Sequence, residues 1–188
     1  MRRKGFVAAL IVGAAALAVA AFALAGGSGA GFNHLSETLA GYQEVPALST
    51  TGHANFTADV SNDGQSVAWQ LSYADLEGSV LQSHIHFAQR GVNGAIIVFL
   101  CSNLGNGPPG TQPCPAAPAT ISGTFDASDV LCGGCTPTAP AGQGIGAGEF
   151  DELIRAMDAG KTYANLHTST WPGGEIRAQL NETGNPHD

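Results

Sequence analysis

The centre of the chain reads Ser83-His84-Ile85-His86-Phe87-Ala88-Gln89-Arg90-Gly91-Val92-Asn93-Gly94-Ala95-Ile96-Ile97-Val98-Phe99-Leu100. We interpret it as a β-strand, a turn bounded by glycines, and a second, almost entirely apolar strand that is buried on both faces. Because side chains alternate between the two faces of a strand, His84 and His86 point in the same direction. Two neighbouring imidazoles on one face are either metal ligands or a polar pair at the surface.

A third histidine, His167, lies in a second run that is typical of a strand, residues 162–168. Three imidazoles with an open fourth position suit copper or zinc, and copper is the first choice. Tyr163 shares the expected face of His167 and is a candidate fourth ligand. The sequence therefore predicts a mononuclear metal site of His84, His86, His167 and Tyr163. The alternative is that the first two lie on a solvated sheet face and that His167 caps a turn.

Turn signals separate short alternating runs along most of the chain. Residues 52–73 predict a β-hairpin around the turn Ser61-Asn62-Asp63-Gly64. Further strands are expected at residues 35–42, 120–125, 162–168 and 175–180. One helix is expected at residues 149–159, where apolar side chains recur at helical spacing. Many short strands with one short helix predict an all-β fold, an antiparallel β-sandwich or barrel with Greek-key-like connections.

The first 25 residues have the pattern of a secretory signal peptide. A basic start is followed by a long apolar run and by the small-residue site Ala23-Leu24-Ala25. We expect cleavage after Ala25 and a secreted, extracellular or periplasmic protein. The alternative is an uncleaved membrane anchor, because the run is long enough to span a bilayer. The rest of the chain is then a flexible linker (26–34), one β domain (35–181) and a polar tail (182–188).

The charge of the chain limits the partners that it can have. The formal net charge is −8 at pH 7, and three of the seven basic residues lie in the first four positions. An acidic domain of this kind repels nucleic acids and anionic membranes. We therefore expect no nucleic-acid partner and no membrane span after signal cleavage. The expected partner is an extracellular protein or a surface.

Four cysteines are present, Cys101, Cys114, Cys132 and Cys135. An even number of cysteines in an exported chain predicts disulfides. Of the three possible pairings we favour Cys101–Cys114 and Cys132–Cys135, because each closes a local loop rich in glycine and proline. The C-x-x-C spacing of the second pair also fits a redox pair or half of a zinc site, and no second such motif supports either alternative.

Other kinds of chemistry find less support. Glu175 and Arg177 alternate on the last expected strand and predict a structural ion pair. No paired carboxylates, nucleophile motif or phosphate-binding glycine loop is evident. The chain has six histidines, and two of them, His34 and His187, lie near its ends. A dinuclear copper–zinc centre of the superoxide dismutase type needs more histidines than the four that remain, so it is not expected.

Three blocks of the sequence resemble, in the same order, the motifs of the CHRD (chordin) domain family. They are Leu39-Ala40-Gly41-Tyr42-Gln43-Glu44-Val45-Pro46, Ser83-His84-Ile85-His86-Phe87 with Gly91 and Gly94, and Tyr163-Ala164-Asn165-Leu166-His167-Thr168 with Gly173-Gly174-Glu175-Ile176-Arg177-Ala178-Gln179-Leu180. The resemblance spans residues 35–180. It departs from the usual pattern at Ser83, where the family has alanine, and at Ala178, where it has glycine.

The resemblance implies an extracellular β-rich module, here a microbial, exported, single-domain member whose histidines align with His84, His86 and His167. The growth-factor role of animal chordin does not transfer, because the cysteine-rich repeats that carry it are absent from this sequence. We therefore expect an exported binding module, not an enzyme, with a copper or zinc site. One alternative is a copper redox enzyme or electron carrier with a superoxide-dismutase-like site. The other is a purely structural or adhesive extracellular domain.

Overall fold

The computed structural model describes residues 32–180. The strands, in chain order, are β1 (His34–Ala40), β2 (His53–Val60), β3 (Ser66–Ala74), β4 (Val80–Phe87), β5 (Ala95–Ser102), β6 (Ala119–Asp126), β7 (Thr162–Thr168) and β8 (Ile176–Gln179). The helices are η1 (Gly41–Gln43), η2 (Ala127–Asp129) and α1 (Phe150–Asp158). The predicted signal peptide, the polar tail and most of the predicted linker lie outside the described residues.

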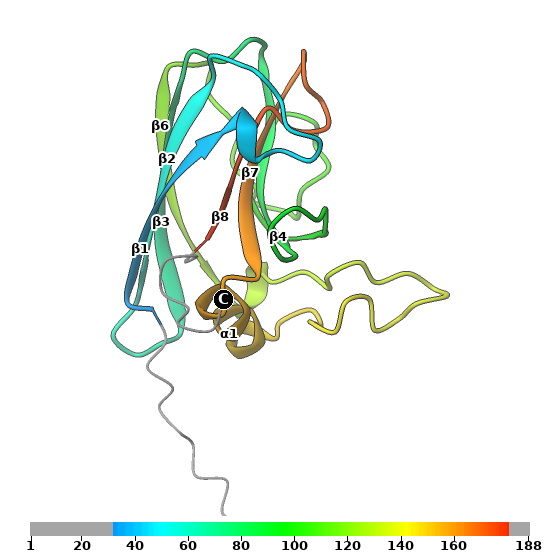
Figure 1. Cartoon of the computed structure of the whole chain (residues 1–188). Helices are drawn as coiled ribbons and strands as arrows, with labels where there is room; N and C mark the ends of the chain where they lie inside the picture. The colour runs from blue at the N-terminus through cyan, green and yellow to red at the C-terminus, as the bar shows by residue number, and fades with distance from the viewer. Residues whose placement is uncertain (1–31, 181–188) are drawn as a thin grey trace, which may run out of the picture.

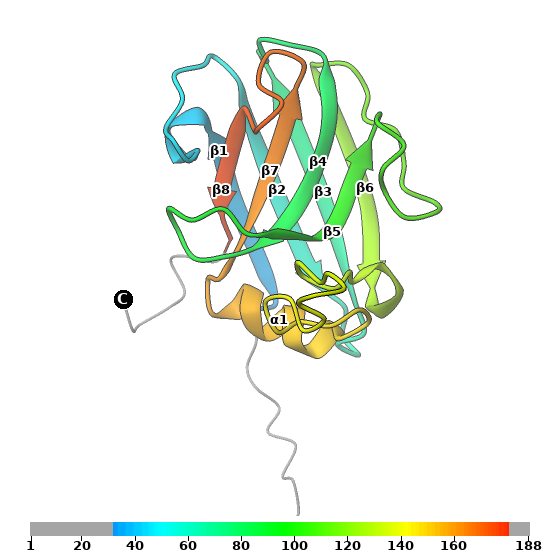
Figure 2. The same ribbon diagram turned by 90° about the vertical axis from the view of Figure 1, so that its right-hand side faces the viewer.

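All eight strands belong to one antiparallel sheet with the order β5-β4-β7-β8-β1-β2-β3-β6. The sheet curls on itself, so that β1, β2, β3 and β6 form one layer and β4, β5, β7 and β8 form the other (Figures 1 and 2). This arrangement confirms the predicted antiparallel β-sandwich or barrel. The terminal strands β5 and β6 are bridged by Gln112, whose side-chain amide donates to the carbonyls of Leu100 and Ser122.

The predicted hairpin is confirmed as β2 and β3, which pair in register from His53↔Ala74 to Val60↔Val67. Its alternating apolar side chains point into the barrel and are buried there, among them Phe56 and Leu71, each 0% exposed. The inward face of each strand therefore supplies the core, and the outward face is left for polar residues.

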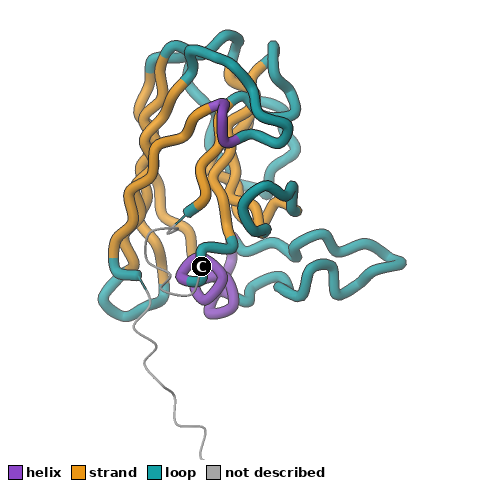
Figure 3. The backbone as a smooth tube through the Cα atoms, in the orientation of Figure 1, coloured by secondary structure: helices purple, strands orange, loops and turns teal. Residues whose placement is uncertain are grey.

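The predicted helix is also confirmed. In α1 the side chains of Phe150, Leu153 and Met157 are buried, and the helix closes one end of the barrel (Figure 3). Gly160 ends the helical segment with a φ of 64°, a conformation that favours glycine. Within residues 32–180, no helix is long and apolar enough to cross a membrane.

Both favoured disulfides are present, Cys101–Cys114 and Cys132–Cys135. The first ties the loop after β5 back to the end of that strand. The second lies in the long segment between β6 and α1, which projects from the barrel (Figure 3). The disulfide bond leaves neither cysteine of the C-x-x-C motif free as a zinc ligand.

The prediction that residues 95–100 are buried on both faces was wrong. Ile97, Val98 and Leu100 are buried, whereas Ile96 and Phe99 are only partly covered. The reason is the position of β5 at an end of the sheet, where its outward face has fewer neighbours. The pairing of β4 with β5 also shifts register at two places, between Ser83/His84 and Ile85/His86.

Candidate metal centre

The three histidines meet on the outward face of two neighbouring strands. β4 pairs with β7 so that Gln82 lies opposite His167 and His84 lies opposite Asn165. His84 and His86 point outward because they alternate with the inward Ile85. The rings of His84 and His167 are 5.0 Å apart, and those of His84 and His86 are 5.3 Å apart, measured between centroids. The register of β4 on β7 thus brings together side chains that are about eighty residues apart in the chain.

One ring nitrogen from each histidine is available to a cation. These three nitrogen atoms all lie within 4.8 Å of one another. Nitrogens that share a zinc ion at about 2.0–2.1 Å each lie about 3.4 Å apart in tetrahedral geometry, so the rings would have to move slightly closer to hold one ion. No carboxylate or cysteine joins the cluster among the described residues. The arrangement therefore provides three imidazole donors on one side of a small space.

Backbone carbonyls orient two of the rings. Nδ1 of His86 donates to the carbonyl of Gly94 at 3.0 Å, and Nδ1 of His167 donates to that of Pro172 at 3.0 Å. A carbonyl can only accept, so the proton is on Nδ1 in both residues, and Nε2 keeps its lone pair. Such a hydrogen bond on the far nitrogen is the usual support of a metal-bound histidine.

The nitrogens that face the cluster have no protein partner. Nε2 of His86, Nε2 of His167 and both ring nitrogens of His84 are buried without a hydrogen bond. Leaving a buried polar atom unpaired costs roughly 1–3 kcal/mol. Several such atoms gathered at one point indicate a site that is completed by something other than the protein chain.

Burial also sets the protonation state of the three rings. It lowers the pKa of His84 to about 2, helped by repulsion from His167 and His86. It lowers the pKa of His86 to about 4, although the hydrogen bond to Gly94 acts in the opposite direction. The pKa of His167 is also lowered, again by burial. All three imidazoles are therefore neutral at pH 7, which is the form that binds metals.

The cluster lies just below the surface. His84 is fully buried, and the ring of Phe99 meets it edge-on at 4.6 Å. His86 and His167 remain 8% and 7% exposed. His86 and His167 are therefore the members of the cluster that reach the solvent, and carbonyls of the loops after β4 and β7 hold their rings.

Tyr163 belongs to the cluster through its ring. The ring stacks on His86 with 4.6 Å between centroids, and its hydroxyl accepts a hydrogen bond from the N–H of Gly94 at 3.2 Å. The guanidinium of Arg177 lies 3.4 Å from the ring centroid. Burial raises the pKa of the Tyr163 hydroxyl, so it is a neutral phenol at pH 7. The role of Tyr163 as a fourth ligand stays a prediction.

The buried carboxyl group of Glu44 contacts Asn165, the residue that lies opposite His84. Nδ2 of Asn165 donates to Glu44 at 2.5 Å and to the carbonyl of Ile176 at 3.2 Å. Burial raises the pKa of Glu44 to about 7, while Asn165 and Arg177 act to lower it. The sequence could not place a partner for Glu44, because this residue lies in the loop after β1, far from β7 in the chain. Nothing in the sequence around Glu44 indicates that Asn165 is its partner.

The predicted ion pair between Glu175 and Arg177 was wrong, because the two residues have different partners. The carboxylate of Glu175 is buried and accepts hydrogen bonds from the Thr50 hydroxyl, the Glu77 N–H and the Thr168 hydroxyl. Arg177 lies on β8 and donates to the side chain of Asn93 and the carbonyl of Val92. Glu175 precedes β8 and turns toward the loops instead of sharing the face of Arg177.

The carbonyls of Gly94 and Pro172 and the ring of Phe99 are parts of the centre that sequence reasoning missed. The only signals that could have pointed to the carbonyls are the glycines at positions 91 and 94 and the run Trp171-Pro172-Gly173-Gly174. Both indicate turns next to a histidine strand. Neither specifies which carbonyl faces the ring.

Comparison with known proteins identifies a family whose model matches this chain. The family model of the CHRD domain matches residues 35–180. The match takes in nearly all the described residues, including the three histidines. No curated protein matches the chain, and no solved structure does.

Proposed function

The chain belongs to the CHRD domain family, and from that basis we propose that it is an exported binding module that holds one metal ion at His84, His86 and His167. The observation that carries the proposal is the convergence of three neutral imidazoles whose facing nitrogens are buried and unpartnered. A bound cation would satisfy these lone pairs at once. The preset orientation of two rings by backbone carbonyls supports the same role.

The donor set favours copper first and zinc second. Calcium and magnesium take oxygen ligands, and the cluster offers only imidazole nitrogens. Imidazole suits both copper and zinc, and copper lies above zinc in the general order of affinity. The acidic surface of the chain would also attract a cation.

The fourth position is the least constrained part of the proposal. The hydroxyl of Tyr163 could serve as a ligand only by giving up the Gly94 N–H and by ionising against a raised pKa. We therefore propose that Tyr163 acts mainly through its stacked ring. A water molecule or a small ligand would then complete the coordination from the side where His86 and His167 are exposed.

A copper redox enzyme or electron carrier is the second candidate. What favours it is the residual exposure of His86 and His167, which leaves an approach for a small molecule or an electron partner. It would require a copper ion that cycles reversibly between oxidation states. A purely structural or adhesive domain becomes the better account if no metal binds.

Export is part of the proposal and rests on two observations. Residues 1–25 have the pattern of a signal peptide, and the four cysteines form two disulfides. The partner would then be an extracellular protein or surface, and the acidic charge argues against nucleic acid.

Metal analysis of the purified protein tests the proposal. The mature domain is purified without an affinity tag from its native compartment and compared with a His84→Ala/His86→Ala variant. The matched control is His53→Ala, because His53 is an exposed histidine on β2, outside the cluster. We expect about one copper or zinc per chain in the wild type and in the control, and none in the double variant. A metal-free wild type that takes up neither ion on addition would overturn the proposal.

A further inference from the structure

The loop after β7, residues 169–174, carries the carbonyl of Pro172 that holds the ring of His167. The position of this carbonyl decides which ring nitrogen of His167 carries the proton. A neutral imidazole without a fixed acceptor can carry its proton on either nitrogen. If Nδ1 lost its acceptor, the proton could therefore move to Nε2, the nitrogen that faces the cluster, and Nε2 could then no longer bind a metal. The geometry of this loop is thus part of the metal centre.

Trp171, the residue before Pro172, is tied to Thr168 by two hydrogen bonds. The N–H of Trp171 donates to the Thr168 hydroxyl at 3.2 Å, and the N–H of Thr168 donates to the Trp171 carbonyl at 3.2 Å. The N–H of Gly174 donates to the same carbonyl at 3.1 Å. The peptide bond between Trp171 and Pro172 is therefore held in one orientation, and Thr168 supplies most of the hold.

The hydroxyl of Thr168 is in turn oriented by Glu175. It donates to Oε2 of Glu175 at 2.6 Å. A hydroxyl has one proton to donate, so the bond to Glu175 leaves a lone pair of the Thr168 oxygen for the N–H of Trp171. Thr168 and Glu175 are each 0% exposed. Neither group therefore has water as an alternative partner, and the bond between them closes the base of the loop.

The remaining contacts of this loop are at the surface. Ser169 exchanges two hydrogen bonds with Ser79, and Thr170 and Trp171 each donate from their side chains to Glu77. Ser79, Glu77, Ser169 and Thr170 are exposed, so water competes for these bonds. We therefore expect the buried bond at the base of the loop to hold it more firmly than the surface contacts do.

We propose that Thr168 and Glu175 are positioning residues of the metal centre, which keep the proton of His167 on Nδ1 and leave its Nε2 free for a metal. Their effect on metal affinity rests on the proposed function. Their effect on the proton of His167 does not, because it exists in the metal-free protein. Glu175 also accepts hydrogen bonds from the Thr50 hydroxyl and the Glu77 N–H, so its carboxylate has partners that do not lead to His167.

NMR spectra of the ring nitrogens at pH 7 test this role in the metal-free protein, because they distinguish a protonated nitrogen from one with a free lone pair. In the wild type we expect the proton on Nδ1 in both His86 and His167. Thr168→Val keeps the shape of the side chain and removes its hydroxyl. In this variant a measurable share of His167 should carry the proton on Nε2, and His86 should be unchanged because Gly94 lies in another loop. Metal affinity, measured by competition with a chelator, should fall about tenfold.

Two further variants of the relay complete the test. Thr168→Ser keeps the hydroxyl and should behave as the wild type does. Glu175→Gln replaces one accepting oxygen by a donating amide, so it cannot accept from Thr168, Thr50 and the Glu77 N–H together. It should therefore move the proton of His167 in the same direction as Thr168→Val, and it serves in its place if that variant does not fold.

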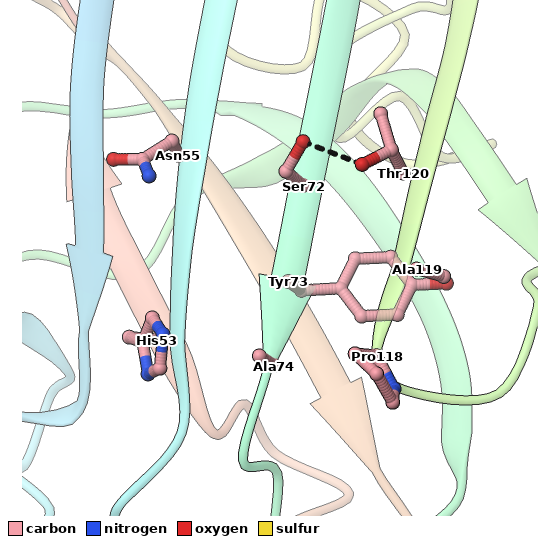
Figure 4. A pocket seen from close by; sticks show the side chains of 8 residues that line it. All are labelled: His53, Asn55, Ser72, Tyr73, Ala74, Pro118, Ala119 and Thr120. Atoms are coloured by element: carbon pink, nitrogen blue, oxygen red, sulfur yellow. Dashed lines mark hydrogen bonds between the residues drawn. The ribbon is translucent and has the colours of Figure 1, made fainter.

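Two controls separate positioning from a general loss of stability. Thr50→Val removes the other hydroxyl that donates to Glu175 and leaves the bond to Thr168 in place. Thr120→Val removes a strand hydroxyl that is bonded to Ser72 on the opposite layer (Figure 4). Both controls should keep the proton of His167 on Nδ1, whatever their effect on thermal unfolding.

The proposal is overturned if His167 of the wild type carries its proton on Nε2, or if Thr168→Val and Glu175→Gln leave the proton on Nδ1. It is also overturned if Thr50→Val moves the proton as far as Thr168→Val does. A wild type that binds no metal, with a His167 proton that still moves in Thr168→Val, would contradict the metal site and support the control of the His167 proton by Thr168 and Glu175.

Discussion

The ring of Tyr163 lies parallel to the ring of His86, with 4.6 Å between the centroids and 2° between the planes. The two residues are opposite one another on β7 and β4. This stack limits the rotation of the imidazole, and the carbonyl of Gly94 holds the same ring at Nδ1. His86 is therefore positioned from two directions before any ligand arrives, as a prepared metal ligand would be.

Substitution of Tyr163 separates the role of its ring from that of its hydroxyl. Tyr163→Phe keeps the stack, and we expect it to bind metal in the same amount as the wild type, with an affinity within about tenfold. Tyr163→Leu removes the stack and should weaken metal binding further, because His86 gains freedom. Competition with a metal chelator measures both affinities. Loss of the metal in Tyr163→Phe alone would instead identify the hydroxyl as the fourth ligand.

Acid should destabilise the metal-free protein through the buried histidines. The pKa of His84 is about 2 and that of His86 is about 4 in the folded chain, against an ordinary value of 6.5. Below pH 6.5 the unfolded state therefore binds more protons than the folded state, and the free energy of unfolding falls as the pH drops toward 4. Urea unfolding at a series of pH values measures this slope. The His84→Ala/His86→Ala variant should show a shallower slope, and an equal slope would contradict the account.

Glu44 should act in the opposite direction. Its pKa is raised from 4.5 to about 7, so the folded state holds a proton that the unfolded state has lost. The resulting stability is fully present below pH 4.5 and disappears as the pH rises through 7. Glu44→Gln should lack this loss, which we expect to be about 3 kcal/mol. The measurement is the difference in the free energy of unfolding between wild type and variant at acidic and at neutral pH. A difference that does not change with pH would show that Glu44 ionises normally.

Two adjacent glycines, Gly173 and Gly174, provide a matched test of the packing around Asn165 and Glu44. A Cβ at Gly174 would lie 2.8 Å from Asn165 Nδ2 and 2.8 Å from a Glu44 oxygen, and its φ is 128°. Gly174→Ala should therefore reduce the free energy of unfolding by roughly 1–3 kcal/mol, since both the space and the backbone conformation oppose a side chain. Gly173→Ala is the control, because a Cβ there meets nothing within 4 Å. Urea unfolding of the two variants should separate them clearly, and equal stabilities would argue against the tight packing of Asn165 on Glu44.

The two disulfides should differ in their contribution to stability. Cys101 and Cys114 are 13 residues apart, whereas Cys132 and Cys135 are separated by only 3. Because a longer closed loop constrains the unfolded chain more, Cys101→Ala/Cys114→Ala should cost about 3 kcal/mol. Cys132→Ala/Cys135→Ala should cost less, and its segment projects away from the barrel. Thermal or urea unfolding compares the two double variants, and the reverse order would contradict this reasoning.

Much of the fold could be predicted from local patterns. The alternation in residues 52–73 and the helical spacing from Phe150 to Met157 each reflect which side chains must be buried, and such patterns survive in the structure. The strand at residues 95–100 shows the limit. Its composition alone could not reveal that it ends the sheet, because that depends on how all eight strands are ordered.

The candidate site likewise has parts that the local sequence predicts and parts that it does not. His84 and His86 could be placed on one face from their spacing, and His167 could be nominated from its strand. Their meeting depends on the register of β4 on β7, a contact between distant segments that no local pattern specifies. The roles of the Gly94 carbonyl and the Glu44 carboxyl could not be predicted for the same reason, since loops bring both groups to the site.

Anomalous diffraction from crystals of the metal-loaded mature domain would locate the ion and its ligands. We predict one anomalous peak per chain, with Nε2 of His86, Nε2 of His167 and one ring nitrogen of His84 at about 2.0–2.1 Å from it. The hydrogen bonds from Nδ1 of His86 to Gly94 and from Nδ1 of His167 to Pro172 should remain. A peak at any other place, or a histidine cluster that stays empty in metal-soaked crystals, would contradict the metal centre proposed for this chain.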